Sequence, residues 1–499
     1  MPRYILAIDQ GTTSTRALVF DESLTPCALA QTELTQHYPA PGWVEHDGEE
    51  IWRATVDVCK RAMDEVGGPG AIACIGITNQ RETTLAWERA TGAPIHKAIV
   101  WQDRRTADVC DGLRAAGHEA HIQAETGLLL DPYFSGTKAA WILDHVEGAR
   151  ARAEQGALAF GTIDTFLLWR LTGGRVHATD VTNASRTMLL GLQPAGWRAD
   201  LCHLLNVPMA VLPNVRPSAG LFGMTDARVF GAEIPITGVA GDQQAALVGH
   251  GCLTPGRAKA TFGTGCFLVM NTGAAPARSR NRLLATIGYQ IGPAPIYALE
   301  GSIFSAGATI QWLRDGLGAI SASRESEAIA SSLGDNGGVY LVPAFAGLGA
   351  PHWEAGARGA VTGLTRDSTS AHIVRAGLEA IAYQTRDLLD ALRADGAPPI
   401  EALLVDGGVT DNAWAMQFLA DICDVPIERP ANQEVTALGA AKLAALGAGL
   451  IPNLEQVRDA APRRRWAPRM ADDERGRLLA GWRAAVSGTL AVARERTSA

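Results

Sequence analysis

Asp242 is the residue whose position in the sequence best suits general-base chemistry. It follows a short apolar run that ends at Gly241, which predicts a carboxylate at the end of a strand, facing a cleft. Such a carboxylate can accept a proton from a reacting group. The structural alternative is that Asp242 caps a helix over residues 243–248, a common position for Asp.

A turn rich in hydroxyl groups near the N-terminus is suited to binding phosphate. It lies between two short apolar runs, residues 5–8 and 17–20, which predict a pair of strands. Asp9, at the end of the first run, could bind a metal ion through its oxygens. The spacing of a P-loop is absent, and a hairpin without a ligand is the alternative. Converging donors and positive charge bind phosphate oxygens, and the turn offers them on Thr12, Thr13, Ser14 and Arg16.

A second turn of similar composition occurs in the other half of the chain. Within residues 258–271, two strand-like runs flank a Gly/Thr turn that includes Thr264 and Gly265. Duplicated halves that face each other would bring the two turns to one cleft. We therefore predict two domains, residues 1–246 and 247–499. Chance similarity between two Gly/Thr turns is the alternative.

Composition limits the classes of function. A chain of 499 residues with 47% hydrophobic residues can form two or three globular domains. A net charge of −8 argues against nucleic acid as the main partner. The eight cysteines include no C-x-x-C pair, which argues against a zinc site and fits a reducing cytosol. We find no signal peptide and no apolar run long enough for a membrane span, so we expect a cytoplasmic protein.

The elements around these residues alternate between strand-like and helical patterns. Residues 71–78, 98–101 and 403–405 are short apolar runs that predict buried strands. Apolar residues at helical spacing predict helices over 49–66, 105–116 and 412–423. This alternation is typical of the α/β class.

Five further residues have side chains that could contact a small ligand that carries hydroxyl groups. Arg81 and Glu82 lie in a loop between two predicted strands within residues 75–84; Arg donates to hydroxyl oxygens, and Glu accepts hydroxyl protons. Taken alone, this pair reads as a surface ion pair. Trp101, Tyr133 and Phe267 could pack against the carbon chain of such a ligand, although most aromatic residues belong to the core.

Several motifs in order carry a resemblance to a known family. Residues 9–14, the turn at 262–265 and the turn at 406–408 together resemble the FGGY carbohydrate kinases, and residues 133–144 and 359–379 are similar to that family's two signatures. The resemblance extends from Tyr4 to Trp482. It implies an α/β fold of two actin-like (ribonuclease H-like) domains with a cleft between them. It also implies acceptor binding by the N-terminal domain and nucleotide binding by the C-terminal domain.

The pattern is most similar to the family members that phosphorylate glycerol with ATP and Mg²⁺. The resemblance implies that Asp242 is the general base, that Asp9 organises Mg²⁺, and that the protein is a homodimer or homotetramer. The acceptor residues that it implies are Arg81, Glu82, Trp101, Tyr133, Asp242, Gln243 and Phe267. The nucleotide residues that it implies are Thr12, Thr13, Ser14, Arg16, Thr264, Gly265, Gly307, Gln311, Gly408 and Asn412.

One segment departs from the family pattern, and three alternatives stay open. Bacterial members carry a Gly-Gly-Lys-Gly type loop for inhibition by fructose 1,6-bisphosphate, whereas residues 226–233 here lack the lysine and most of the glycines. We therefore expect no such inhibition. The alternatives are a kinase for another small polyol or ketose, a nucleotide-driven switch like the actin and chaperone relatives, and an inactive kinase that acts as a scaffold.

Overall fold

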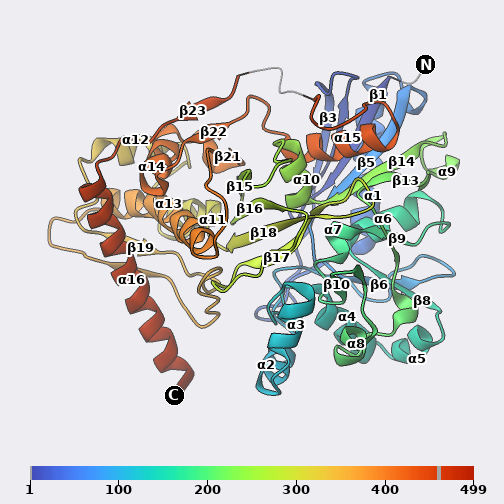
Figure 1. Ribbon diagram of the computed structural model, residues 1–499, viewed down its shortest axis with the longest axis horizontal. Helices are drawn as coiled ribbons and strands as arrows, with labels where there is room; N and C mark the ends of the chain where they lie inside the picture. Colours follow the sequence, from blue (N-terminus) through green and yellow to red (C-terminus); the bar gives the residue numbers. More distant parts are fainter. Residues whose placement is uncertain (1–2, 458–461, 499) are drawn as a thin grey trace.

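The computed structural model describes residues 3–457 and 462–498, and its strands form two large mixed β-sheets (Figure 1). The first sheet has six strands in the order β13-β14-β5-β1-β2-β3. Their bounds are β1 (Tyr4–Gln10), β2 (Ser14–Phe20), β3 (Pro26–Glu33), β5 (Ile72–Asn79), β13 (Ala219–Met224) and β14 (Pro235–Gly241).

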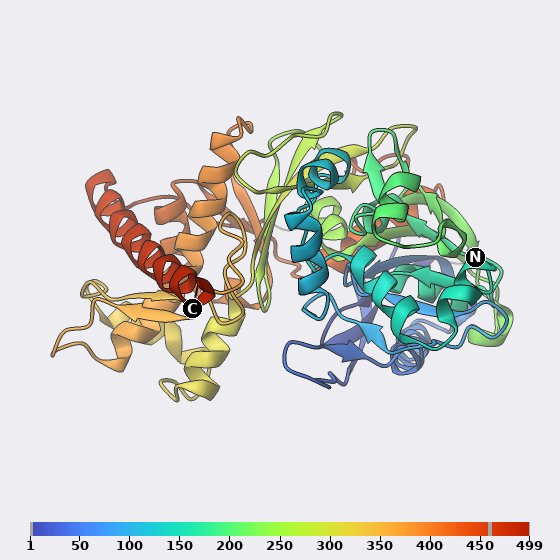
Figure 2. The ribbon, with the colours of Figure 1, turned by 90° about the horizontal axis from the view of Figure 1, so that it is seen from below.

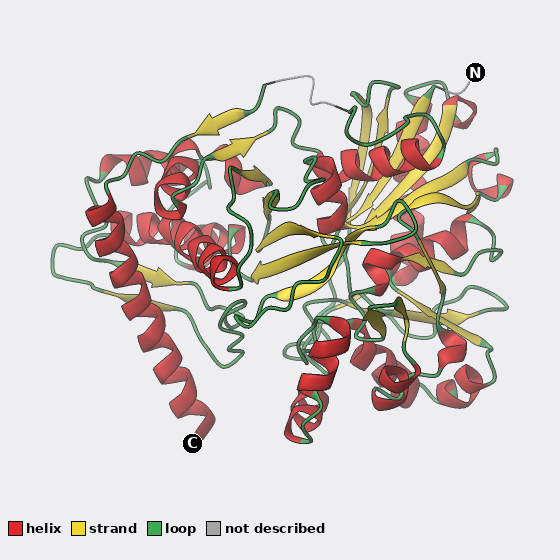
Figure 3. Ribbon diagram, in the orientation of Figure 1, coloured by secondary structure: helices red, strands yellow, loops and turns green. Residues whose placement is uncertain are grey.

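The second sheet has seven strands in the order β17-β18-β16-β15-β21-β22-β23. Their bounds are β15 (Ala258–Phe262), β16 (Cys266–Gly273), β17 (Leu284–Tyr289), β18 (Ile296–Ile303), β21 (Leu403–Asp406), β22 (Ile427–Arg429) and β23 (Arg464–Trp466). The first sheet lies at the upper right of Figure 3, and the second extends from the centre to the upper left, with helices beside both.

The two sheets repeat one arrangement. In the first, the antiparallel hairpin β1–β2 is continued by β5, parallel to β1, and by β14, parallel to β5. In the second, the hairpin β15–β16 is continued by β21 and β22 in the same way. The predicted similarity between the two hairpins is therefore confirmed as a repeated topology. The division predicted after residue 246 falls inside helix α10 (Asp242–Gly249).

The alternating residues of β1 explain why this strand lies at the centre of its sheet. Leu6 and Ile8 pack into one apolar core with helix α1 (Gly48–Asp64), and Ile5 and Ala7 pack into another with helix α15 (Val435–Gly447). Successive side chains of a strand point to opposite faces, so an unbroken apolar run is buried on both sides. Helix α1 begins after Asp47, whose side chain accepts hydrogen bonds from two backbone N–H groups of the first turn.

Helices α10 and α15 connect the two halves of the chain through close backbone contacts. A Cβ atom at Gly439 of α15 would lie 1.8 Å from the carbonyl oxygen of Ala245 in α10. A Cβ atom at Gly76 of β5 would lie 2.3 Å from the carbonyl oxygen of Ala440. Only glycine allows this approach. Helix α15, late in the sequence, thereby packs on the first sheet and holds α10 at the junction of the two halves.

Three long helices cover the second half: α13 (Ser370–Ala394), α14 (Ala413–Cys423) and α16 (Asp472–Ser498). Helix α16 runs along its outer side, so that the two chain ends lie in opposite halves (Figure 2). The other helices are α2 (Ala107–Ala115), α3 (Glu119–Thr126), α4 (Ser135–His145), α5 (Ala149–Glu154), α6 (Ile163–Leu171), α7 (Val181–Ala184), α8 (Ala199–Leu204), α9 (Ala227–Phe230), α11 (Gly307–Gln311) and α12 (Glu325–Ser332).

Ten short strands form five pairs outside the two sheets. They are β4 (Glu45–His46) with β7 (Ala98–Ile99), β6 (Leu85–Glu88) with β8 (Leu158–Gly161), β9 (Ala178–Asp180) with β12 (Asn214–Arg216), β10 (Leu190–Leu192) with β11 (Ala195–Trp197), and β19 (Tyr340–Val342) with β20 (Ala360–Thr362). The strand predicted over 98–101 is only β7, because Trp101 already lies in a turn. The helices predicted over 49–66, 105–116 and 412–423 are confirmed as α1, α2 and α14. Within residues 3–457 and 462–498, no helix combines the length and apolar character of a membrane span.

Candidate active site

The turn between β1 and β2 is held by hydrogen bonds that leave hydroxyl groups available. The N–H of Gly11 donates to the carbonyl of Ser14 at 2.9 Å, and Gln36 Nε2 donates to the carbonyl of Thr12 at 2.7 Å. Thr12 and Thr13 line a cavity, whereas Ser14 begins β2 and is not one of the lining residues. Two of the three predicted hydroxyl residues therefore face this cavity.

The turn between β15 and β16 depends on glycine for its close packing. The N–H of Gly307 donates to the carbonyl of Gly263 at 2.9 Å, and a Cβ atom at Gly307 would lie 2.5 Å from that oxygen. A Cβ atom at Gly265 would lie 2.4 Å from the carbonyl oxygen of Ile303. These contacts exclude a side chain at either position. The turn therefore packs directly against the end of β18 and the start of α11.

One cavity of about 420 Å³ lies between the two turns, and we call it the central cavity. All seven predicted acceptor residues line it, together with five of the ten predicted nucleotide residues. Its lining is Thr12, Thr13, Gln36, Tyr38, Arg81, Glu82, Trp101, Gln102, Tyr133, Asp242, Gln243, Thr261, Gly263, Thr264, Gly265, Phe267 and Gln311. Both halves of the chain thus contribute to one polar site.

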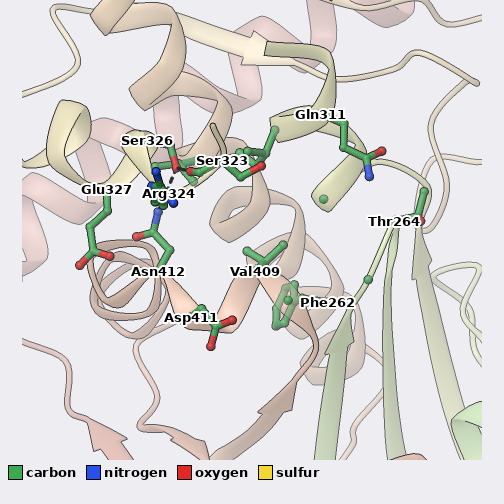
Figure 4. Close-up of a pocket in the computed structure, with 15 residues that line it drawn as sticks. Phe262, Thr264, Gln311, Ser323, Arg324, Ser326, Glu327, Val409, Asp411 and Asn412 are labelled. Atoms are coloured by element: carbon green, nitrogen blue, oxygen red, sulfur yellow. Dashed lines mark hydrogen bonds between the residues drawn. The ribbon is translucent and has the colours of Figure 1, made fainter. Parts of the chain in front are cut away.

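A second cavity of about 440 Å³ adjoins the central cavity, and we call it the side cavity (Figure 4). The two cavities share Gly263, Thr264 and Gln311. The side cavity contains the remaining predicted nucleotide residues of the second half, Gly307, Gly408 and Asn412. Its complete lining is Phe262, Gly263, Thr264, Gly307, Ile310, Gln311, Ser323, Arg324, Ser326, Glu327, Leu378, Gly408, Val409, Asp411 and Asn412. An elongated ligand could therefore extend from one cavity into the other.

Asp9 and Arg16, predicted for metal and phosphate, form an ion pair with each other. Arg16 also donates to Glu434 at 2.7 Å, so two carboxylates face its guanidinium group. Neither Asp9 nor Arg16 lines the central cavity. In the described part of the chain, no group of three or more His, Cys, Asp or Glu side chains could hold a metal ion by itself.

Arg81 and Glu82 belong to a buried ionic network rather than to a surface pair. Arg81 donates to Glu300 at 2.5 and 3.0 Å, and Arg186 donates to Glu82 at 2.6 Å and to Glu300 at 2.9 Å. All four side chains are at most 2% exposed. The backbone of Glu82 has φ near +60°, an unusual conformation for a residue other than glycine. Buried ion pairs need this degree of mutual hydrogen bonding, because desolvation otherwise outweighs their attraction.

Asp242 is the first residue of α10, directly after β14. The cap position belongs to Gly241, so the capping role considered for Asp242 is wrong; its carboxylate instead accepts from the N–H of Gln243 at 2.7 Å. Arg81 Nε lies 3.2 Å from Asp242 Oδ1. Burial raises the pKa of Asp242 to about 6, against the attraction of Arg81, and Glu82 adds to the rise. Such a carboxylate can take up a proton near neutral pH.

The three predicted aromatic residues stand together at one wall of the central cavity. The ring centres of Trp101 and Tyr133 are 5.7 Å apart, and those of Trp101 and Phe267 are 5.9 Å apart, in edge-to-face arrangements. Arg81 Nη2 also donates a hydrogen bond to the hydroxyl oxygen of Tyr133 at 3.3 Å. The wall therefore offers apolar faces beside a polar network.

Comparisons with known proteins identify the family of the chain. Residues 4–249 match the N-terminal domain of the FGGY family of carbohydrate kinases, and residues 258–448 match its C-terminal domain. The chain belongs to the FGGY family of carbohydrate kinases. A glycerol kinase from Rhodospirillum centenum is 60% identical over 97% of this chain and 98% of the relative. Glycerol kinase 1 from Pseudomonas aeruginosa is 57% identical over 97% of this chain and 99% of the relative.

Solved structures of two other kinases have the same fold. The glycerol kinase of Plasmodium falciparum with ADP is 37% identical, covers 98% of both chains and has a TM-score of 0.90. A xylulose kinase from Rhodospirillum rubrum is 25% identical, covers 99% of this chain and all of the other, and has a TM-score of 0.86. The predicted two-domain α/β fold is therefore confirmed.

Three charged residues of this FGGY kinase site were missed by the sequence interpretation. Lys259 is buried and donates to Gln243, to the hydroxyl of Thr261 at 2.9 Å and to the carbonyl of Phe267 at 3.3 Å. The other two, Arg186 and Glu300, complete the network around Arg81. A charged residue inside an apolar strand, such as Glu300 in β18, was the available signal, because burial of a charge requires a partner.

Proposed function

We propose that this chain is an ATP:glycerol 3-phosphotransferase. It transfers the γ-phosphoryl group of ATP to glycerol and releases sn-glycerol 3-phosphate and ADP. The observation that carries the proposal is the carboxylate of Asp242, 3.2 Å from Arg81, in one cavity with the two glycine and threonine turns. The family match and the relatives named glycerol kinase, at 60% and 57% identity, support the same substrate.

The side chains of the central cavity offer the hydrogen-bonding groups and apolar faces that glycerol would need. Its hydroxyl groups would receive hydrogen bonds from Arg81 and Gln243 and donate to Glu82 and Asp242. Its carbon chain would pack against the aromatic wall of Trp101, Tyr133 and Phe267, which lies beside these polar groups.

Asp242 would act as the general base in the transfer step. Its carboxylate takes the proton of one terminal hydroxyl group, and that oxygen forms a bond to the γ-phosphorus atom of ATP. The bond between this phosphorus and the β,γ-bridging oxygen breaks, and ADP leaves with the electron pair. The proton then passes from Asp242 to solvent. A base of this kind contributes typically about 10²–10⁴ in rate.

The nucleotide would extend from the central cavity into the side cavity. Thr12, Thr13, Thr264 and Gly265 would bind the phosphates, and Gly307, Gln311, Gly408 and Asn412 would hold the nucleoside. Arg16, which was predicted to bind phosphate, is paired with two carboxylates. We propose that it holds Asp9 in place at the base of the first turn.

The donor set fits Mg²⁺ that is bound mainly by the nucleotide. Mg²⁺ retains several waters and uses one or two carboxylates together with substrate phosphates, so a protein cage is not required. Asp9, at the end of β1 and directly before the first turn, is the carboxylate that would hold it, through water. The bound ion neutralises charge on the phosphate oxygens.

An acceptor panel tests the proposed substrate against the main alternative, another small polyol or a ketose. Purified protein with Mg-ATP should release ADP in a glycerol-dependent manner, and the product should be a 3-phosphate by NMR. We expect kcat/KM for glycerol to exceed that for erythritol, xylitol or xylulose by about 10²-fold. A preference for xylulose would favour the ketose alternative. ADP release that is independent of every acceptor would favour a nucleotide switch.

The assembly and the location of the protein are further proposals. Family resemblance suggests a homodimer or homotetramer in the cytoplasm, with glycerol and ATP as the small-molecule partners. Light scattering coupled to size exclusion would measure the number of chains, and fractionation of cells would locate them. A monomeric mass at micromolar concentration would contradict the proposed assembly.

A further inference from the structure

Glu300 is a carboxylate of the second sheet that serves side chains of the first half. It lies in the middle of β18, where its backbone pairs with Val269 of β16. Its side chain is fully buried and accepts from Arg81 Nη1 at 2.5 Å, Arg81 Nη2 at 3.0 Å and Arg186 Nη2 at 2.9 Å. One carboxylate therefore fixes two guanidinium groups across the junction of the halves.

This contact determines where the remaining donor of Arg81 points. With both Nη atoms engaged by Glu300, the Nε atom lies 3.2 Å from Asp242 Oδ1. Gln244 and Tyr133 also contact the Nη atoms, each at 3.3 Å. The planar guanidinium group presents its donors in a fixed fork, so holding one edge orients the other. Glu300 thus positions the cation that faces the proposed base.

Charge balance gives Glu300 a second effect. Arg81 and Arg186 bring two positive charges into the network, and Glu82 and Glu300 bring two negative charges. Without Glu300 the network would carry a net positive charge beside Asp242. A positive charge favours the ionised form of a carboxylate and makes it a weaker base.

We propose that Glu300 is a positioning residue for phosphoryl transfer, which orients Arg81 and offsets its charge so that Asp242 remains an effective base. The inference rests on the proposed function, because it assigns Glu300 a role in that reaction. It adds a residue of the second sheet to a site whose acceptor side otherwise belongs mainly to the first half.

The electrostatics of the neighbouring groups support the inference. Burial acts to raise the pKa of Glu300, but Arg186 and Arg81 outweigh it and lower this pKa to about 2, so Glu300 stays ionised. Burial raises the pKa of Asp242 to about 6 although Arg81 is adjacent. The charged groups that face Asp242 are Arg81 and Glu82 from the loop after β5 and Lys259 from β15, with Arg186 and Glu300 behind Arg81.

The test is the pH profile of turnover in two opposite charge variants. Glu300→Gln keeps the shape of the side chain and removes its charge. We expect the acid limb of kcat/KM to move down by about one pH unit and kcat at the plateau to fall by about three- to tenfold. Arg186→Met removes a positive charge, so the acid limb of kcat/KM should move to higher pH. The double variant restores the balance, so its limb should return toward that of the wild type.

Glu379→Gln is the matched control. Glu379 of α13 is also fully buried and accepts from Arg375 at 2.8 Å, but it contacts neither cavity. Its loss should lower the melting temperature and leave the acid limb in place. Glu300→Asp keeps the negative charge on a shorter side chain. The acid limb of kcat/KM should therefore stay at the same pH, and kcat should fall.

The outcomes separate this inference from the proposed function. Wild-type protein that does not phosphorylate glycerol contradicts the function itself. If the wild type is active, an unmoved limb in either Glu300→Gln or Arg186→Met overturns the role of Glu300. Equal shifts in Glu379→Gln overturn it as well, because they would reflect general destabilisation. Either single variant suffices for the measurement if the other does not fold.

Discussion

The indole Nε1 of Trp101 donates a hydrogen bond to Oγ1 of Thr12 at 2.9 Å. This contact joins the aromatic wall of the acceptor site to the turn that is proposed to bind phosphate. Because the hydroxyl oxygen of Thr12 accepts from Trp101, its own hydrogen is free to donate to a phosphate oxygen. The proposed glycerol site and the proposed phosphate site are thus joined by a direct contact between two side chains.

Trp101→Phe tests this connection. The variant keeps an aromatic face for glycerol and loses the indole N–H. A net hydrogen bond is worth about 1 kcal/mol, so we expect kcat/KM for ATP to fall by about fivefold. The KM for glycerol should change less. Trp87→Phe is the control, because Trp87 Nε1 is buried without a hydrogen-bond partner among residues 3–457 and 462–498, and Trp87 does not line the central cavity. A fall confined to glycerol kinetics would contradict the connection.

Asp242→Asn should lose turnover while keeping nucleotide binding. The amide retains shape and hydrogen bonding but is a poor proton acceptor. We expect kcat to fall by about 10²–10⁴, the range for loss of a general base. Calorimetric titration with ADP should give an affinity close to that of the wild type. A variant that retains a third of the wild-type kcat would exclude the assigned role.

The pH dependence of the wild type should follow the same carboxylate. Burial raises the pKa of Asp242 to about 6, and a base acts only when it is deprotonated. The kcat/KM for glycerol should therefore be constant above this pKa and should fall by about tenfold for each unit below it. Measurement from acidic to neutral pH gives the inflection. A flat profile across pH 6 would mean that Asp242 does not titrate there.

Glu82→Gln should weaken glycerol use far more than ATP binding. The substitution removes a charged acceptor from the central cavity and from Arg186, which donates to it at 2.6 Å. Hydrogen bonds to charged groups are worth about 1.5–3 kcal/mol, so we expect kcat/KM for glycerol to fall by about 10- to 150-fold. A melting curve controls for lost stability. Unchanged kcat/KM would remove Glu82 from the acceptor site.

Fructose 1,6-bisphosphate should not inhibit this enzyme. The single arginine of residues 226–233, Arg228, is paired with Asp226 at 2.6 Å, and α9 begins directly after Asp226. The segment therefore offers neither a free cation nor a glycine loop for two phosphate groups. Activity should be measured at fixed glycerol and ATP with increasing bisphosphate. Half-maximal inhibition below about 1 mM would reveal an anion site elsewhere in the protein.

Local sequence was enough to predict the parts of the site. The hairpins around Thr12 and Thr264 follow from short apolar runs that flank Gly/Thr turns, and both are confirmed. The alternation of strand-like and helical patterns predicted the α/β class. Both patterns are local properties of the sequence, because side chains repeat every two residues in a strand and every 3.6 residues in a helix. The resemblance to a family supplied the acceptor residues, and all seven line the central cavity.

Tertiary structure alone decided how the charged residues pair. Arg16 donates to Glu434, which follows it by 418 residues, and no local pattern predicted this pairing. Glu300 reaches Arg81 from the other sheet, 219 residues away in sequence. No spacing rule reports such contacts, because they depend on how α15 and α10 hold the two sheets against each other. The sequence determined which groups the chain carries, and the packing of its two halves determined which of them meet.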